Sequence, residues 1–515
     1  MKRRSFLRHL SHSLAVPGVV GSMGFKMPDH SLEKLLRMAS DDGKVLVMIY
    51  LDGGNDGLNT VVPLDQLSAL NKVRPHVILP EDKLIKLSDA EIGLHPAMSG
   101  LKSLYDEDRF QIIQNVGYAQ QNYSHFRSTD IWMSASDSDQ LVNTGWGGRM
   151  LNDRYAGFPD NYPSEEMPDP LAVEIGFGNS LIFQGPQSAM GMVINDPDFF
   201  YQLVNNEEQE APETPAGDKL KFLRLIARQS QQYGQVVKAA AERVTSQANY
   251  PQTFIAQQLK IVSQLIAGGL QTPLYLVRLG GFDTHDAQVE ASDHTTGEHA
   301  TLLTELNDAI MAFMSDLEKQ GTDDRVTGMT FSEFGRRIVS NASLGTDHGS
   351  AAPMFVFGNA VRGGVTGSNP QISSNSDYDD NLPWEYDFRQ IYASVISQWL
   401  GADQTQLDNS LLKNFEQIDI IGVRQKQLSV RSEEHGLIVF PNPVSDLAHI
   451  RVNPTTEPVS IEVLNLEGKS IRSIYHGSIL SNKDISWDAS TLPPGRYFVI
   501  VRGQSTRRVF SISKR

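Results

Sequence analysis

Acidic and histidine side chains stand next to several apolar runs of the chain. Asp52 directly follows one run, and Asp283 and His285 follow another. Carboxylate oxygens and imidazole nitrogens are the ligands that zinc, manganese, magnesium and calcium take from proteins. Each residue alone fits a turn or a structural role, so the prediction rests on their combination. We predict a divalent-metal site made of Asp52, Asp283, His285, Asp347 and His348.

Ser124 precedes a predicted helix that runs through Trp132. The free N–H groups and positive dipole at a helix start suit an anion, so Ser124 is a candidate nucleophile for a phosphoryl group. The same position suits a helix N-cap, and the spacing alone favours that simpler role. Four further residues are candidates for ligands or anion contacts: His299, Glu333, His125 and Arg127.

The elements that position these residues follow from the hydrophobic pattern. Apolar runs rich in β-branched residues predict strands, and an apolar period of 3.6 residues predicts helices over 299–318 and from Lys219 to about Gly268. Strands that alternate with helices indicate an α/β fold, a layered sheet with helices on both faces. Sites in such sheets lie beyond the carboxyl ends of the strands. The predicted strands are 45–51, 110–116, 274–279, 326–331 and 354–358.

Composition excludes several kinds of site. The chain has 515 residues and a formal net charge of −16, without the basic surplus typical of a nucleic-acid binder, so we expect no nucleic-acid partner. It contains no cysteine, which excludes disulfides, zinc–thiolate sites and cysteine nucleophiles. Any metal must therefore be held by Asp, Glu, His or backbone oxygen.

The chain begins with an export pattern. Arg3 and Arg4 lie in Arg-Arg-Ser-Phe-Leu, and a modest apolar stretch follows. This resembles a twin-arginine signal over residues 1–30, with the twin-arginine translocase as a partner; the alternative is a basic, disordered N-terminus. Later segments lack the apolar length of a membrane span, so we expect no integral span.

Short alternating strands and turns after Glu433 predict a small C-terminal all-β sandwich over 435–515. This part resembles the C-terminal sorting domain of the type IX secretion system, which implies that secretion machinery as a partner and an extracellular or outer-membrane surface location, reached through the periplasm. The alternative is an ordinary immunoglobulin-like accessory module. The matching stretches are Pro441-Asn442-Pro443, Asn465-Leu466-Glu467-Gly468-Lys469 and Pro494-Gly495-Arg496-Tyr497-Phe498-Val499.

Residues from about Lys44 to Gly401 resemble a sulfatase-like family of exported bacterial proteins of unknown function in the alkaline phosphatase superfamily. The resemblance implies an alkaline-phosphatase-like domain, which we place over 44–425. The motifs that carry the resemblance are Leu51-Asp52-Gly53-Gly54-Asn55-Asp56-Gly57, Tyr123-Ser124-His125-Phe126, Gly281-Phe282-Asp283-Thr284-His285, Thr330-Phe331-Ser332-Glu333-Phe334-Gly335-Arg336-Arg337 and Gly345-Thr346-Asp347-His348-Gly349.

The superfamily's plan implies roles for these residues. Asp52, Asp347 and His348 resemble one metal site, Asp283 and His285 resemble a second, and Ser124 falls where the nucleophile belongs. The usual final histidine ligand is missing, and His299 or Glu333 is the candidate to replace it. The context from which sulfatases make formylglycine is also missing, which favours phosphate over sulfate chemistry.

These observations predict a secreted or cell-surface metal-dependent hydrolase of phosphate or sulfate esters, on a small molecule or a polysaccharide. Two alternatives remain open: a catalytically inactive surface binding protein on the same fold, and a structural component of the envelope.

Overall fold

The computed structural model describes residues 43–194 and 233–422 except Asn161, Glu166, Phe177 and Asn179, and residues 437–514 except short stretches within 441–445, 453–457, 465–469, 480–482, 491–494 and 503–506. The chain divides into two compact units, Met1–Arg424 and Gln425–Arg515. The predicted signal over residues 1–30 lies outside the described residues.

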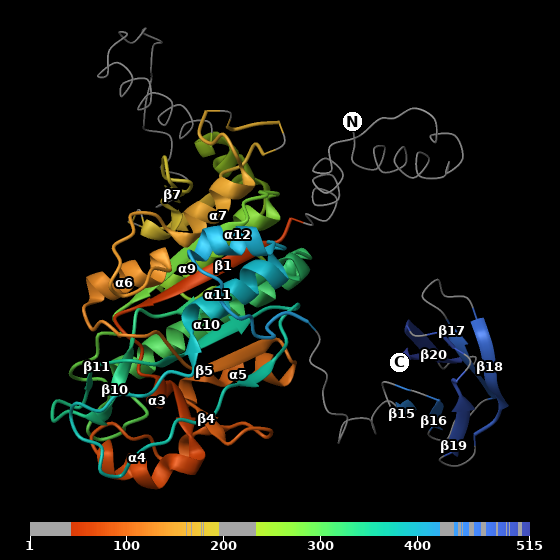
Figure 1. Cartoon of the computed structure of the whole chain (residues 1–515). Coiled ribbons are helices and arrows are strands. Elements are labelled where there is room, and N and C mark those ends of the chain that lie inside the picture. Colours follow the sequence, from red (N-terminus) through yellow and green to blue (C-terminus); the bar gives the residue numbers. More distant parts are fainter. Residues whose placement is uncertain are drawn as a thin grey trace. The chain divides into compact units, whose positions relative to one another are not determined.

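A nine-stranded sheet forms the centre of the first unit (Figure 1). Strand β1 (Val45–Asp52) lies between β8 (Leu274–Gly280) and β9 (Val326–Phe331) and is parallel to both. Seven of its eight residues are buried, because layers cover both faces of the sheet. The strand order is β13 (Gly364–Thr366), β5 (Phe110–Gly117), β12 (Ala352–Phe357), β9, β1, β8, β6 (Ala172–Ile175) and β7 (Met192–Ile194), with β14 (Tyr386–Asp387) paired to β5.

Two hydrophobic cores lie on the two faces of this sheet. Val47 and Ile49 of β1 point into one core, and Met48 and Tyr50 point into the other, as the period of two in a strand requires. Helices on both sides confirm the predicted α/β layered sheet (Figure 1). The first core receives α5 (Ser99–Asp106), α9 (Phe254–Ala267) and α10 (Glu298–Gln320); the second receives α6 (His125–Ser134), α7 (Trp146–Arg154), α11 (Phe388–Ser394) and α12 (Gln404–Leu411).

One strand of the central sheet runs against its neighbours. After β9 the chain forms the hairpin β10 (Gly335–Ser340) and β11 (Thr346–Gly349), then re-enters the sheet as β12, antiparallel to both β5 and β9. The hairpin leaves and returns at one edge, so β12 has to run backwards. Residues that precede β12 therefore reach the edge at which the parallel strands end.

Smaller elements complete the first unit. A three-stranded sheet is formed by β2 (Val61–Pro63), β4 (Ile92–Leu94) and β3 (Ile85–Lys86), next to α3 (Gly57–Thr60) and α4 (Leu67–Val73). The single long helix predicted up to about Gly268 is wrong, because the chain is not helical over 244–253. That stretch contains Pro251, which has no backbone N–H to donate.

The C-terminal unit consists of two antiparallel sheets with a shared core that includes Ile450, Val463 and Val499. This confirms the predicted small all-β domain. One sheet contains β15 (Leu437–Phe440), β16 (Leu447–Val452) and β19 (Lys483–Asp488); the other contains β18 (Ser470–Gly477), β17 (Val459–Leu464), β20 (Gly495–Arg502) and β21 (Arg507–Lys514). Among the described residues of the whole chain, the structure contains no helix with the length and apolar character of a membrane span.

Candidate metal centre

Three histidines converge on one aspartate at the edge of the central sheet. Asp283 and His285 follow β8, His348 lies in β11, and His125 begins α6. The Nε2 atoms of His348 and His285 lie 3.0 and 3.1 Å from Asp283 Oδ1, and His125 Nε2 lies 3.4 Å from Asp283 Oδ2. We call these four residues the His–Asp cluster.

The hydrogen bonding of His348 defines which of its nitrogens faces the cluster. Its Nδ1 lies 2.8 Å from the carbonyl oxygen of Tyr123. A carbonyl only accepts, so Nδ1 carries the proton, and Nε2 of the neutral ring presents a lone pair. That lone pair faces Asp283 Oδ1 and also His285 Nε2, which is 2.9 Å away. Burial lowers the pKa of His348, which favours this neutral form.

His285 has the same arrangement with a carboxylate partner. Its Nδ1 lies 2.7 Å from Asp347 Oδ1. Burial alone would raise the pKa of Asp347, but hydrogen bonds from Tyr378, His285 and Asn341 outweigh burial and lower it. The ionised carboxylate accepts the Nδ1–H, so His285 also turns the lone pair of Nε2 towards Asp283. Asp347 therefore orients a candidate ligand from behind.

His125 is held by the buried carboxylate of Glu333. The distance between His125 Nδ1 and Glu333 Oε1 is 2.8 Å, and the two Glu333 oxygens lie 2.9 and 3.2 Å from the backbone N of Gly53. The hydrogen bond to Glu333 raises the pKa of His125 above its usual value. Glu333 thus orients His125 and lies behind it.

Asp283 is the anionic member of the cluster. Burial alone would raise its pKa, but the hydrogen bond from Arg336 and the positive charge of that guanidinium outweigh burial and lower the pKa to about 2. The carboxylate is therefore ionised at neutral pH and faces imidazole lone pairs.

Acceptors that face one another at about 3 Å repel unless a positive charge lies between them. Three imidazole nitrogens and one carboxylate also match the ligand preferences of zinc and of other divalent transition metals. Within the part of the chain that the structure describes, His125, Asp283 and His348 offer ligand atoms that all lie within 4.8 Å of one another, the spacing of a metal site. The donor set therefore fits a divalent metal ion.

Asp52 points elsewhere. Its carboxylate lies 3.6 Å from Arg278 Nη1, and the Arg278 guanidinium lies over the Tyr50 ring. The loop that follows Asp52 contributes its backbone instead: the N–H of Gly53 donates to Glu333, and the carbonyl of Gly54 accepts from Arg336. The early motif thus supports the cluster through main-chain groups.

Two other candidates have structural partners away from the cluster. His299 is buried, with Nε2 2.9 Å from Asn55 Oδ1, and burial lowers its pKa to about 4. Arg127 donates to the carbonyl oxygens of Asp137, Ser138 and Gln140, which closes the loop after α6.

Ser124 occupies the N-cap position of α6 but makes no capping hydrogen bond with its side chain. It is exposed, and its backbone N–H donates to Asn122 Oδ1 over 2.8 Å. Its chain neighbours Tyr123 and His125 contact His348 and Asp283 respectively. Ser124 is therefore the chain neighbour of two residues in contact with the cluster, and its hydroxyl does not cap the helix.

Some residues that support the cluster were not predicted from the sequence. Asn341 donates to the carbonyl oxygen of His285 over 2.8 Å, and the Phe334 ring packs 4.9 and 4.5 Å from the rings of His125 and His348. The position of Phe334 next to Glu333 in the chain was the one available signal.

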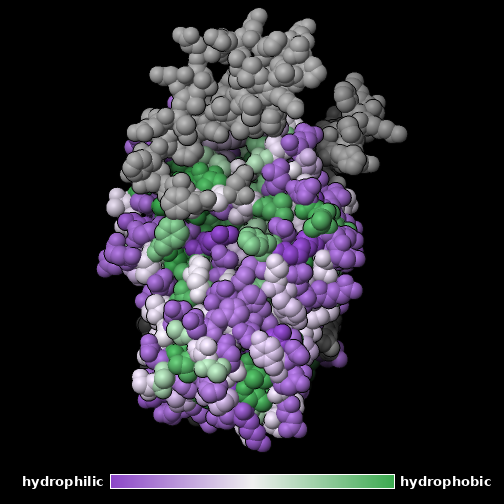
Figure 2. Space-filling view, turned by 90° about the vertical axis from the view of Figure 1, so that its left-hand side faces the viewer, coloured by the Kyte–Doolittle hydropathy of each residue, from purple (hydrophilic) through white to green (hydrophobic). Residues whose placement is uncertain are grey.

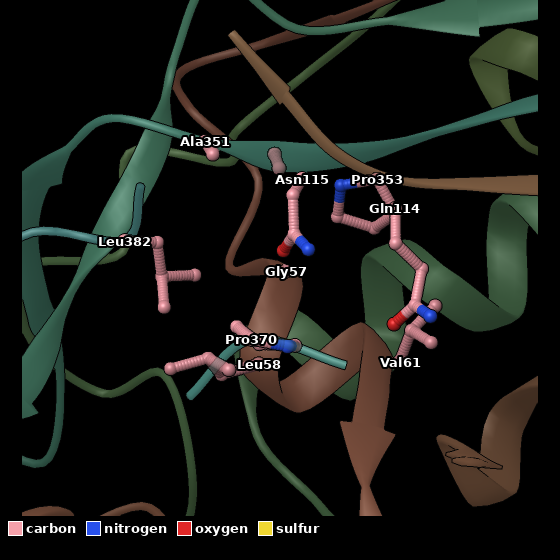
Figure 3. Close-up of a pocket in the computed structure, with 10 residues that line it drawn as sticks. Gly57, Leu58, Val61, Gln114, Asn115, Ala351, Pro353, Pro370 and Leu382 are labelled. Atoms are coloured by element: carbon pink, nitrogen blue, oxygen red, sulfur yellow. The ribbon is translucent and has the colours of Figure 1, made fainter. Parts of the chain in front are cut away.

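The face that includes α6 and the β10–β11 hairpin is mostly hydrophilic, with separate hydrophobic groups (Figure 2). The close-up in Figure 3 shows a different place, a small and partly open cavity of about 20 Å³ lined by residues that include Leu58, Asn115 and Leu382. This volume holds about one water molecule. The cavity shares no lining residue with the cluster and is too small for an ester substrate.

The fold and site define a mixed α/β protein with a His–Asp cluster at one sheet edge. Residues 210–407 match the model of a family described as "Protein of unknown function (DUF1501)". Residues 438–513 match the model described as "Secretion system C-terminal sorting domain". The chain thus contains a stretch that matches the DUF1501 family and a sorting domain of the type IX secretion system, which directs it to the cell surface or the extracellular space.

Solved structures similar to this chain include a sulfatase from Pseudoalteromonas sp., at 10% identity and TM-score 0.33, covering 90% of this chain and 88% of that one. A protein of the alkaline phosphatase superfamily from Vibrio parahaemolyticus has 8% identity and TM-score 0.31, covering 91% and 82%. A phosphonate monoester hydrolase from Silicibacter pomeroyi has 9% identity and TM-score 0.31, covering 91% and 88%. No curated protein matches the chain. We therefore argue function from the chain's own residues.

Proposed function

We propose that the protein is a secreted metal-dependent hydrolase of phosphate or sulfate esters, with its ion held by the His–Asp cluster. In this proposal Asp283, His285 and His348 bind the ion and His125 is the fourth ligand. Residues 44–425 form the hydrolase domain, and residues 435–515 form the sorting domain.

The observation that carries the proposal is the direction of the imidazole lone pairs. His348 donates from Nδ1 to a carbonyl oxygen, so its Nε2 carries no proton. This unprotonated nitrogen faces the ionised carboxylate of Asp283. The histidines of a metal site are held in this way, with the second ring nitrogen bonded to a carboxylate or a carbonyl. In histidines with a purely structural role, the ring lone pairs are not expected to converge on one point.

A divalent ion bound there supplies Lewis acidity at an ester oxygen. Ser124 is the proposed nucleophile: its Oγ forms a bond to phosphorus while the P–O bond to the leaving alkoxide breaks, and the serine proton passes to that alkoxide, which leaves as the alcohol. Water later cleaves the phosphoserine, which releases inorganic phosphate and restores the hydroxyl. The free N–H groups of the first turn of α6, which the Ser124 side chain leaves uncapped, stabilise the anionic ester. Phosphate esters are the more defensible substrates, because a serine hydroxyl can perform this chemistry without modification.

The test begins with metal analysis of the purified full chain, then calorimetry with Zn²⁺ and Mn²⁺ on chelator-treated protein. We expect about one ion per chain. Asp283→Asn removes the central anion and should lower affinity by about 100-fold or more, since it also leaves Arg336 without its charged partner. Asp52→Asn is the matched control, because its carboxylate faces Arg278, and should keep the affinity.

Turnover is measured with p-nitrophenyl phosphate and p-nitrophenyl sulfate. Ser124→Ala should abolish hydrolysis while cation affinity stays the same, and the exposed Ser374→Ala should change neither. Ion binding without hydrolysis of any ester would support the alternative of a surface binding protein. Absence of ion binding would refute the proposal.

We also propose that residues 1–30 are a twin-arginine signal. That route exports folded proteins, so an ion could be loaded before export. Replacing Arg3 and Arg4 by Lys should stop the protein from reaching the cell surface, as measured by fractionation. Normal export of this variant would indicate a general signal.

A further inference from the structure

A buried guanidinium lies directly beneath the His–Asp cluster. Arg336, in β10, is 1% exposed, and it is the register partner of His348 in β11. Its Nη2 lies 2.8 Å from Asp283 Oδ1. Because it is buried, Arg336 is neither exposed to bind an oxyanion from solvent nor part of a surface ion pair.

The remaining contacts of Arg336 are to backbone carbonyl oxygens. Nε donates to Gly54 over 2.7 Å, Nη1 to Thr346 over 2.8 Å, and Nη2 to Phe282 over 2.8 Å and to Gly53. Each of these carbonyls lies in a segment that builds the site. Arg336 therefore joins the loop after β1, the loop after β8 and the start of β11 through one side chain.

These segments approach one another closely where Arg336 holds them. A Cβ added at Gly53 would lie 2.3 Å from the backbone N of Asp283, so the two loops are in direct backbone contact. Gly53 also donates its N–H to Glu333, the carboxylate behind His125. The loop at Gly53 thus contacts both Glu333, which holds His125, and the backbone of Asp283.

We propose that Arg336 is the positioning residue of the metal site: it sets the three segments and the Asp283 carboxylate in place before an ion arrives. This inference rests on the cation site of the proposed function and deepens it. A planar guanidinium suits this positioning role, because its donors point in fixed directions and can bind several acceptors at once. A lysine ammonium keeps the charge but lacks that geometry.

The first test compares Arg336→Lys with the unaltered full chain, using Zn²⁺ and Mn²⁺ in calorimetry after chelator treatment. We expect affinity to fall 10- to 100-fold, the range found when partners behind metal ligands are removed. Arg149→Lys is the matched control. Arg149, in α7, is also buried and donates to backbone carbonyls, among them those of Ser134 and Ser410.

Both variants lose comparable backbone contacts, so both should lower the Tm of the ion-free protein. Only Arg336→Lys should lower ion affinity. Equal affinity in Arg336→Lys and the unaltered chain would overturn the inference, as would an equal loss in Arg149→Lys. If the unaltered chain binds neither ion, the proposed function itself fails.

A second measurement needs no variant and stands even if Arg336→Lys does not fold. Hydrogen exchange is followed on the ion-free unaltered chain and again with Zn²⁺. A positioning role predicts that the amides of Gly53 and Phe282, which donate to Glu333 and to the Asp52 carbonyl, are already protected without the ion and gain little from it. Free exchange of these amides until Zn²⁺ is added would overturn the inference.

Discussion

His285 and Asp347 form a hydrogen bond of 2.7 Å between imidazole Nδ1 and carboxylate Oδ1, and the other imidazole nitrogen points at Asp283. The sequence resemblance implies that both are metal ligands, in two different sites. In the structure, Asp347 lies behind His285, on the side of the ring away from Asp283. Asp347 thereby orients His285, and makes the ring a stronger donor to an ion.

The first prediction tests this arrangement. Asp347→Asn keeps the size of the side chain but removes its charge, so we expect a 10- to 100-fold loss of Zn²⁺ affinity in calorimetry. The stoichiometry should stay unchanged, since an orienting residue is not itself a ligand. Asp379→Asn is the control, an exposed carboxylate in the neighbouring loop that pairs with Arg337. A change in stoichiometry for Asp347→Asn would identify it as a ligand instead.

The second prediction concerns Gly53, whose φ is +125° and whose missing side chain lets Asp283 approach. Gly53→Ala should destabilise the fold and also displace Asp283, which lowers ion affinity. Gly176 has a similar φ of +137° but no atom within 4 Å of an added Cβ.

Gly176→Ala therefore serves as the control for backbone strain, which costs about 1–3 kcal/mol in either variant. Chemical unfolding should show the larger loss for Gly53→Ala, and calorimetry should show reduced ion affinity for that variant alone. Equal behaviour of the two variants would show that contact with Asp283 is unimportant.

The third prediction concerns pH and follows from the pair His125 and Glu333. The hydrogen bond to Glu333 raises the pKa of His125 in the folded chain. The pair therefore stabilises the ion-free fold fully below the unfolded pKa of about 6.5, and this contribution is lost as pH rises through the folded pKa. Because an ion binds only to neutral imidazoles, the ion affinity should change in the opposite direction and increase as pH rises.

Unfolding with a chelator present at pH 5.5 and 8.5 measures the first effect. The stability lost in His125→Gln should be larger at pH 5.5 than at pH 8.5. His76→Gln, a change at an exposed histidine outside the cluster, corrects for general effects of pH. A loss for His125→Gln that grows with pH would contradict the predicted sign.

Hydrophobic patterning was enough to predict the main strands and the α/β class. β1, β8 and β9 occur where largely apolar runs predicted them, since strands covered on both faces are mostly apolar. The reversed direction of β12 could not be predicted, because pairing direction depends on where the hairpin returns and leaves no periodic signal.

The proximity of some candidate residues follows from the same pattern. Strand ends identify which segments reach the sheet edge, so the sequence predicted that Asp283, His285 and His348 lie close together, and their role as ligands stays a prediction. Side-chain direction decides the rest: Asp52 turns to Arg278, and His125 rather than His299 faces the cluster. That choice depends on buried partners such as Glu333, which spacing does not reveal.

The hairpin between β9 and β12 contributes several residues of the site from one short stretch of the chain. Glu333, Arg336, Asp347 and His348 all lie in it or at its start, so one short segment supplies one proposed ligand and the groups that hold three others. Its two ends enter neighbouring strands of one sheet. A change within this one segment would therefore alter the proposed ligands and their supports together, while the paired strands of the central sheet keep their places.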